Sequence, residues 1–137
     1  MMLGSRLVNG DNFECTSLVG LKVEEMIAFH EEGNADNIVT ILAKFQGKSL
    51  WQRLFLDIGF GFWEEYDKES AFEDFEGDPY FNWGEMYSLI GEAVKSIACV
   101  GSYCVLSQMF FKIGDVELNL GFKDSDDWES DVILTNL

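Results

Sequence analysis

Hydrophobic and polar residues alternate along residues 39–45, and the alternation resumes at residue 50 after a short turn that contains glycine. The apolar positions of the two runs are Val39, Ile41, Ala43 and Phe45, followed by Leu50, Leu54, Leu56 and Ile58. Gln46-Gly47-Lys48 separates the runs. Successive side chains of a β-strand point to opposite faces, so a period of two around a glycine turn is typical of a hairpin. We therefore predict an antiparallel β-hairpin over residues 39–58.

Residues 109–122 contain the clearest pattern of a half-buried strand. An apolar run over residues 109–113 leads to Gly114-Asp115, and a strictly alternating run follows over residues 116–122. One side of this second run holds Val116, Leu118, Leu120 and Phe122, whereas the other holds Glu117, Asn119 and Gly121. This pattern predicts a second hairpin with one buried face.

One helix is predicted to begin after Asn82, which can cap it, with Glu85 at the capping-box position. Apolar residues at helical spacing support the helix as far as Gly91, where we expect it to end. Residues 18–30 are expected to be extended, and residues 96–106, apolar on both faces, are typical of a central strand. The predicted fold class is α+β and mainly β, an antiparallel sheet of hairpins with one or two packed helices.

The segment between residues 67 and 80 follows neither a strand nor a helix period. Acidic residues alternate irregularly with Phe72, Phe75 and Tyr80, and Gly77-Asp78-Pro79 marks a turn. We expect a long, partly ordered connection, which in a compact domain is often functional.

Composition indicates a single globular domain over residues 1–137, because 47% of the residues are hydrophobic and only one is proline. The longest apolar stretch, residues 97–106, is far shorter than the roughly 20 residues of a membrane-spanning helix. The odd number of cysteines, Cys15, Cys99 and Cys104, favours a reducing compartment over a disulfide framework. We therefore expect a cytoplasmic protein that does not associate with membranes.

Charge narrows the choice of partner. The chain has 25 acidic and 9 basic residues and a formal charge of −16. Much of the acid falls in two segments, residues 64–85 and residues 124–131, and the second contains no basic residue. A field of this sign repels nucleic acid and attracts basic proteins. The expected partner is a basic protein, and nucleic acid is excluded.

The sequence contains no motif that predicts catalysis, a metal or a cofactor. Gly47-Lys48-Ser49 lacks the preceding glycine of a phosphate-binding loop, and the loop from Asp124 lacks the glycine and glutamate of an EF-hand. His30 is followed by Glu31-Glu32-Gly33, which is typical of a solvated turn. The cysteines form no local ligand pair, so we expect them to be buried, reduced and metal-free. The chain is predicted not to be an enzyme.

The remaining signal is the mixture of aromatic and acidic residues within the two segments. Aromatic side chains can supply binding energy while surrounding charge supplies steering and selectivity. The alternative is that the aromatics belong to the core and the acids keep the surface soluble. The residues predicted to bind a partner are Trp63, Glu64, Glu65, Tyr66, Asp67, Glu73, Asp74, Asp124, Asp126, Asp127, Trp128 and Glu129.

The C-terminal part of the chain, from Ile90-Gly91-Glu92-Ala93-Val94 through residues 116–122 to the acidic end, resembles small acidic bacterial proteins of uncharacterised families. Some of these resemble immunity proteins encoded beside polymorphic toxins. The resemblance implies a bacterial, intracellular, non-enzymatic inhibitor of a basic toxin or other basic partner, and it assigns no site residues. Two alternatives remain: a homodimeric structural or regulatory domain, and a small enzyme or ligand binder with a pocket between sheet and helix.

Overall fold

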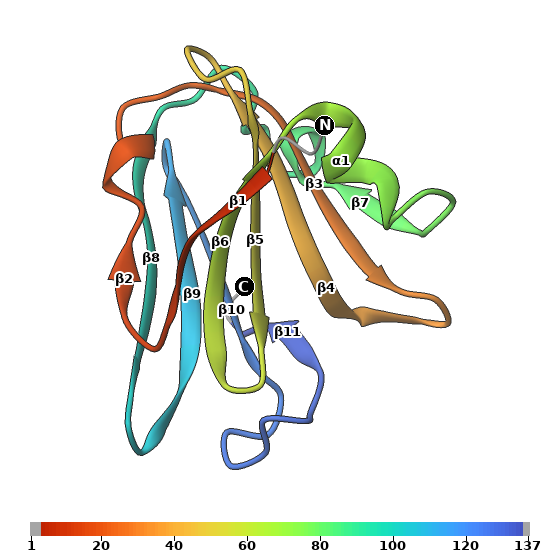
Figure 1. Cartoon of the computed structure of the whole chain (residues 1–137), viewed down its shortest axis with the longest axis vertical. Helices are drawn as coiled ribbons and strands as arrows, with labels where there is room; N and C mark the ends of the chain where they lie inside the picture. The colour runs from red at the N-terminus through yellow and green to blue at the C-terminus, as the bar shows by residue number, and fades with distance from the viewer. Residues whose placement is uncertain (1–3, 136–137) are drawn as a thin grey trace.

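The protein consists of two antiparallel β-sheets that pack face to face (Figure 1). The computed structural model describes residues 4–135, with side chains placed from residue 7. The first sheet has the order β1 (Gly4–Gly10), β6 (Phe60–Tyr66), β5 (Trp51–Asp57), β4 (Asn34–Phe45), β3 (Val23–Glu31) and β7 (Tyr80–Asn82). The second has the order β11 (Val132–Leu134), β10 (Val116–Phe122), β9 (Val105–Ile113), β8 (Val94–Ser102) and β2 (Phe13–Glu14). The predicted class, mainly β with antiparallel pairing, is confirmed, although the strands form two sheets.

The main core lies between the sheets and is built from the inward-facing side of each alternating strand. Ile41 and Leu54 of the first sheet and Ile97 and Phe111 of the second are almost completely buried within it. The backbone of one sheet approaches the other closely at Gly61, where an added Cβ would overlap the Cys99 sulfur. Glycine is required there because no other residue leaves room for the opposite sheet.

Both predicted hairpins are confirmed. In the first, β4 pairs with β5 through Ile41↔Leu54, Leu42↔Arg53 and Ala43↔Gln52. In the second, β9 pairs with β10 from Val116↔Ile113 onward, and Leu118, Leu120 and Phe122 of β10 are buried as the alternation requires. The extended segment predicted over residues 18–30 corresponds to β3, preceded by the short 3-10 helix η1 (Thr16–Leu18).

Three sequence predictions need correction. The helix predicted from Asn82 to Gly91 is only the four-residue α2 (Trp83–Met86); Asn82 does cap it by accepting from the Glu85 N–H at 3.2 Å. Ser88 has a positive φ of 55°, which a right-handed α-helix does not allow, so the helix cannot continue through this residue. Residues 96–106 are not one strand, because the chain turns back at residues 103–104 between β8 and β9. The segment predicted to be irregular contains helix α1 (Lys68–Glu73).

Helix α1 covers a second, smaller core on the outer face of the first sheet. This core contains Phe29 of β3, Leu42 of β4 and Trp51 of β5, together with Ala71 and Phe75 from the α1 segment. Asp67 caps the helix, and its carboxylate accepts from the Ser70 N–H at 2.7 Å. The short helix is stabilised by this capped first turn and by tertiary packing, since a six-residue helix has little stability of its own.

Strands β4 and β5 separate after the Ile41↔Leu54 pair. Strand β4 extends back to Asn34 and β5 extends on to Asp57, but no register pair joins those ends. In Figure 1 the lower part of β4 swings away from β5 and approaches β11. The Val132 N–H donates to Asn37 Oδ1 at 2.9 Å, so a side chain of the first sheet accepts a hydrogen bond from the edge strand of the second.

Candidate functional site

The α1 segment and the outer face of the first sheet enclose a cavity of about 990 Å³, which we name the α1 groove. Its floor is aromatic and is centred on Phe29. The Phe29 ring stacks on Phe75 at 4.8 Å, meets Phe72 edge-on at 6.1 Å and lies 5.7 Å from Tyr80. Phe29 and Phe75 are buried, whereas Tyr80 is 56% exposed and accessible to a partner. A concave aromatic surface of this size is typical of a binding site.

The rim of the α1 groove is acidic. Four exposed carboxylates line it, from Glu69, Glu73, Glu76 and Asp78. Lys68 is the one basic residue among its described lining residues. The groove therefore combines an apolar interior with a negative border, which is complementary to an apolar side chain flanked by basic ones.

Beside the groove, Arg53 of β5 connects the first acidic segment to the sheet. Its guanidinium carbon lies 5.0 Å from the centroids of the Phe55 and Phe75 rings. Arg53 also forms ion pairs with Glu64 at 3.8 Å and with Asp74 at 3.9 Å. Glu64 is only 4% exposed and accepts from the Tyr66 hydroxyl at 2.8 Å. Because a buried carboxylate needs such partners, this cluster has a structural role.

Several residues of the predicted binding set prove to be structural. Trp63 is buried between the sheets, and its indole N–H donates to Gln52 Oε1 at 2.7 Å, so it cannot anchor a partner on the surface. Glu65 accepts from Gln52 Nε2 at 3.1 Å and pairs with Lys48 at 3.6 Å. Asp67 caps α1. Of the predicted set, Glu73 alone lines the α1 groove.

The second acidic segment is the loop between β10 and β11, residues 123–131. Asp124 Oδ1 accepts from the Asp126 N–H at 3.0 Å, and Asp127 Oδ1 accepts from the Glu129 N–H at 2.9 Å. Both contacts are local turns in which an Asp side chain bonds the backbone two residues on. Trp128 is 50% exposed, in contrast to Trp63. This loop lies at the opposite end of the long axis from α1, so the two acidic segments do not form one face (Figure 1).

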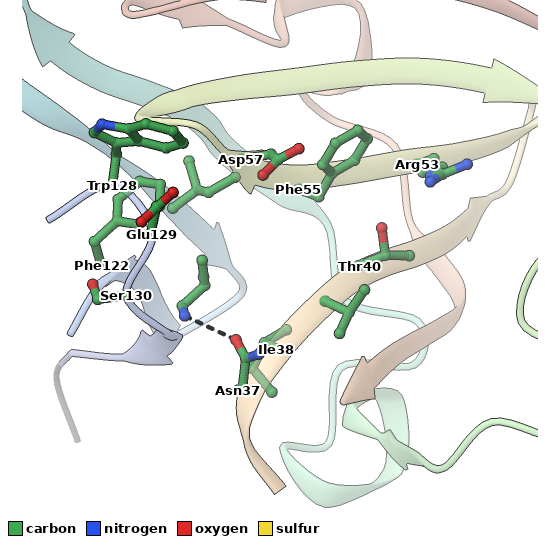
Figure 2. A pocket seen from close by; sticks show the side chains of 13 residues that line it. Asn37, Ile38, Thr40, Arg53, Phe55, Asp57, Phe122, Trp128, Glu129 and Ser130 are labelled. Carbon is green, nitrogen blue, oxygen red and sulfur yellow. Dashed lines mark hydrogen bonds between the residues drawn. The ribbon is translucent and has the colours of Figure 1, made fainter. Parts of the chain in front are cut away.

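The β10–β11 loop closes a second cavity, of about 520 Å³, where β4 and β5 separate; we name it the β4–β5 cavity (Figure 2). Thr40 of β4 and Arg53 and Phe55 of β5 line it from the first sheet. Trp128 and Glu129 line it from the loop. Asn34 helps to hold the loop in place, because its amide donates to Asp131 Oδ2 at 2.8 Å.

Sequence reasoning missed the central residue of the α1 groove, Phe29, and did not include Phe72, Phe75 or Tyr80 in the binding set. The three aromatics were visible as part of the acidic–aromatic segment. Phe29 comes from β3, about forty residues earlier, and only the pairing of β3 with β7 brings it under α1, through Phe29↔Tyr80. Asp67 ahead of Lys68-Glu69-Ser70-Ala71 is the signal that could have revealed the helix.

The residues considered for metal or nucleophilic chemistry do not assemble into a site. Cys15 and Cys99 are buried as expected, whereas Cys104 is exposed in the β8–β9 turn, contrary to the prediction. Burial raises the pKa of the Cys15 thiol to about 12, with a further contribution from Cys99, and burial also raises the pKa of Cys99. His30 belongs to β3 rather than to a solvated turn, and its ring lies 4.7 Å from that of Phe81. Within residues 4–135, no three His, Cys, Asp or Glu side chains gather as metal ligands would.

Neither α1 nor α2, the helices of the described chain, has the length and hydropathy needed to cross a bilayer. Comparisons of the chain with models of protein families, with curated proteins and with solved structures find no match. Function is therefore inferred from the geometry of the two cavities.

Proposed function

We propose that this protein is a non-enzymatic binding module whose α1 groove receives a basic protein partner. The observation that carries the proposal is the coincidence of four aromatic rings with four exposed carboxylates around one cavity. Aromatic side chains in a concave setting are the usual source of binding energy in protein interfaces. The surrounding carboxylates supply electrostatic steering and reject acidic competitors.

The best-fitting occupant is an exposed aromatic or aliphatic side chain with lysine or arginine on either side. Its apolar part would contact Phe72 and Tyr80, and the basic groups would face Glu69, Glu73 and Glu76. A second copy of this chain is a poorer occupant, because two molecules of formal charge −16 repel each other. In its most specific form the proposal is an immunity-type inhibitor in the bacterial cytoplasm that neutralises a basic toxin.

The first test uses a defined probe, a peptide with one phenylalanine between two pairs of lysines, titrated into the isotope-labelled chain. We expect NMR shift changes concentrated at residues 68–80 and at Phe29, with affinity falling steeply as salt is raised. Matched peptides with glutamate for lysine, or alanine for phenylalanine, should bind much more weakly. Shift changes spread evenly over both acidic segments would contradict a specific groove.

Two triple variants separate a specific site from general acidity. Glu69→Gln/Glu73→Gln/Glu76→Gln removes three rim charges, and Asp124→Asn/Asp126→Asn/Asp127→Asn removes the same charge from the distant loop while keeping its hydrogen-bond acceptors. We expect the rim variant to lower the association rate about tenfold or more, and the loop variant to have a much smaller effect. Equal effects of the two variants would indicate that the acidic residues of the rim serve only to keep the protein soluble.

The same variants test the inhibitor hypothesis. A basic protein captured from the source cell supports it only if binding is lost in the rim variant and in Tyr80→Ala but kept in the loop variant. If that protein is a toxin, co-expression of the wild-type chain should restore growth, and the rim variant should not. Growth restored equally by both would place the inhibitory surface elsewhere.

A further inference from the structure

The β4–β5 cavity is lined by two residues that have an unpartnered buried polar atom. Among the described residues, two buried side-chain atoms lack a hydrogen-bond partner, Thr40 Oγ1 and Arg53 Nε, and both residues line this cavity. Thr40 is only 1% exposed. The nearest recorded carboxylate oxygen of Arg53 Nε belongs to Glu64 at 3.8 Å, which is too long for a hydrogen bond. Buried polar groups without protein partners are costly, so two of them beside one cavity make it a candidate site for a ligand with hydrogen-bonding groups.

Thr40 lies where strands β4 and β5 separate. The β4–β5 ladder ends at Ile41↔Leu54, one residue away, and Phe55 does not pair with Thr40 across the opening. Figure 2 shows the hydroxyl on the side of β4 that faces Phe55 and Arg53. A buried hydroxyl, which can both donate and accept, therefore borders the cavity.

The opposite end of the cavity supplies hydrogen-bond acceptors and aromatic faces. In Figure 2 the Asp57 carboxylate stands between the rings of Phe55 and Trp128, and the Glu129 carboxylate lies beside Trp128. Both acids are exposed, and within residues 4–135 neither carboxylate forms a recorded hydrogen bond or ion pair. The half-exposed indole of Trp128 offers a flat apolar surface at the entrance.

This set of groups is selective in charge. An anion would meet the carboxylates of Asp57 and Glu129. The charge of Arg53 is already balanced by Glu64 and Asp74, but its N–H groups are donors only, so an ammonium group at the inner end could not accept a hydrogen bond from them. A neutral molecule rich in hydroxyl groups avoids both penalties, because each hydroxyl can donate to a carboxylate and accept from Thr40 or Arg53. A sugar ring also has an apolar C–H face that can stack on an aromatic ring. The volume of about 520 Å³ lies within the usual range for small-ligand sites, about 300–1,000 Å³.

We propose that the β4–β5 cavity binds a neutral saccharide, one or two rings long, with hydroxyls bonded to Thr40, Arg53, Asp57 and Glu129 and one ring stacked on Trp128. This site is separate from the α1 groove, and its occupation does not depend on the partner proposed above.

The test is saturation-transfer NMR on the full chain with D-glucose, D-galactose, D-mannose, N-acetyl-D-glucosamine, maltose and lactose at millimolar concentration. Glucuronate and glucosamine, the acidic and basic counterparts of glucose, are the charge controls. We expect at least one neutral sugar to bind and both charged counterparts to bind more weakly than glucose. Absence of binding by every neutral sugar, or preference for a charged counterpart, would overturn the proposal.

Variants locate the binding and exclude a folding defect. Thr40→Val keeps the shape but removes the hydroxyl, and it should weaken saccharide binding about tenfold. It should also raise the midpoint of urea unfolding, because an unpartnered buried hydroxyl is removed. Trp128→Ala should weaken binding as well, whereas Thr16→Val, at an exposed threonine in η1, is the matched control. Unchanged binding in both Thr40→Val and Trp128→Ala, or a lower unfolding midpoint for Thr40→Val, would contradict the site.

Discussion

The two acidic segments have similar composition and very different surroundings. The first, around β6 and α1, is tied to the sheet: Glu64 is buried beside Arg53, Glu65 bonds Gln52, and Asp67 caps a helix. The second, the β10–β11 loop, is exposed, and its hydrogen bonds are mostly local turns. The density of acidic residues therefore does not predict their role, because one carboxylate stabilises the fold, another borders a groove and a third makes only a local turn contact.

The largest expected effect on stability comes from a comparison of the tryptophans of the two segments. Trp63→Ala should lower the free energy of unfolding by about 4 kcal/mol, because it removes a buried ring and leaves Gln52 without its indole donor. Trp128→Ala should change it by no more than about 0.5 kcal/mol, because the ring is half exposed. Urea unfolding followed by circular dichroism measures both. Similar losses in the two variants would remove the distinction between the segments.

A second test concerns Arg53, the cation that joins the first segment to the sheet. Arg53→Leu should cost about 3 kcal/mol, because it removes the ion pair that Arg53 forms with the nearly buried Glu64. The double variant Arg53→Leu/Glu64→Leu should recover much of that loss, since an apolar pair avoids the buried charge. Lys112→Leu is the control, because the Lys112–Glu117 pair is exposed and should contribute less than about 1 kcal/mol. A double variant no more stable than Arg53→Leu alone would show that Arg53 acts through the aromatic rings.

The smallest expected effect on stability comes from a comparison of two aspartates, each of which accepts a hydrogen bond from a backbone N–H. Asp67→Ala should destabilise the protein by about 1 kcal/mol, since it removes the cap of α1. Asp127→Ala, which removes a turn contact in the loop, should have an effect of at most about 0.5 kcal/mol. Asp67→Asn should retain most of the stability because asparagine also caps helices. Thermal unfolding of the three variants measures the order, and equal losses for Asp67→Ala and Asp127→Ala would contradict the proposed difference.

The parts of the fold that could be predicted are those set by local pattern. The β4–β5 and β9–β10 hairpins follow from alternation around a turn, and the Asn82 cap follows from residue type. The predicted length of α2 was wrong because the apolar residues that suggested it do not share one buried face: Trp83 is buried, whereas Met86 and Ile90 are about half exposed. Helix α1 has a local start signal in Asp67, but the aromatic packing against β3 and β5 that stabilises it is not visible in any local pattern.

The candidate sites could be predicted only in part, for the same reason. The acidic–aromatic content around α1 is visible in the sequence, but the floor of the groove depends on the β3–β7 pairing. The β4–β5 cavity depends on where the hydrogen-bonded ladder between β4 and β5 ends. The amino-acid types of the paired residues of β4, from Ile41 to Ala43, do not mark them off from the unpaired residues before Ile41. Acidic residues follow both the buried Trp63 and the exposed Trp128, but Trp63 comes after the apolar run Phe60-Gly61-Phe62, whereas three aspartates lie just before Trp128.

The contact between Gly61 and Cys99 has a consequence for the evolution of this chain. The two positions share one small volume between the sheets, and a side chain at position 61 would occupy the space of the Cys99 sulfur. Substitutions at the two sites should therefore not be independent: alanine at 61 becomes acceptable only where position 99 has become smaller. Homologous sequences should show this compensation as correlated change between residues 38 positions apart, which would identify them as sharing this fold even where the acidic segments have diverged.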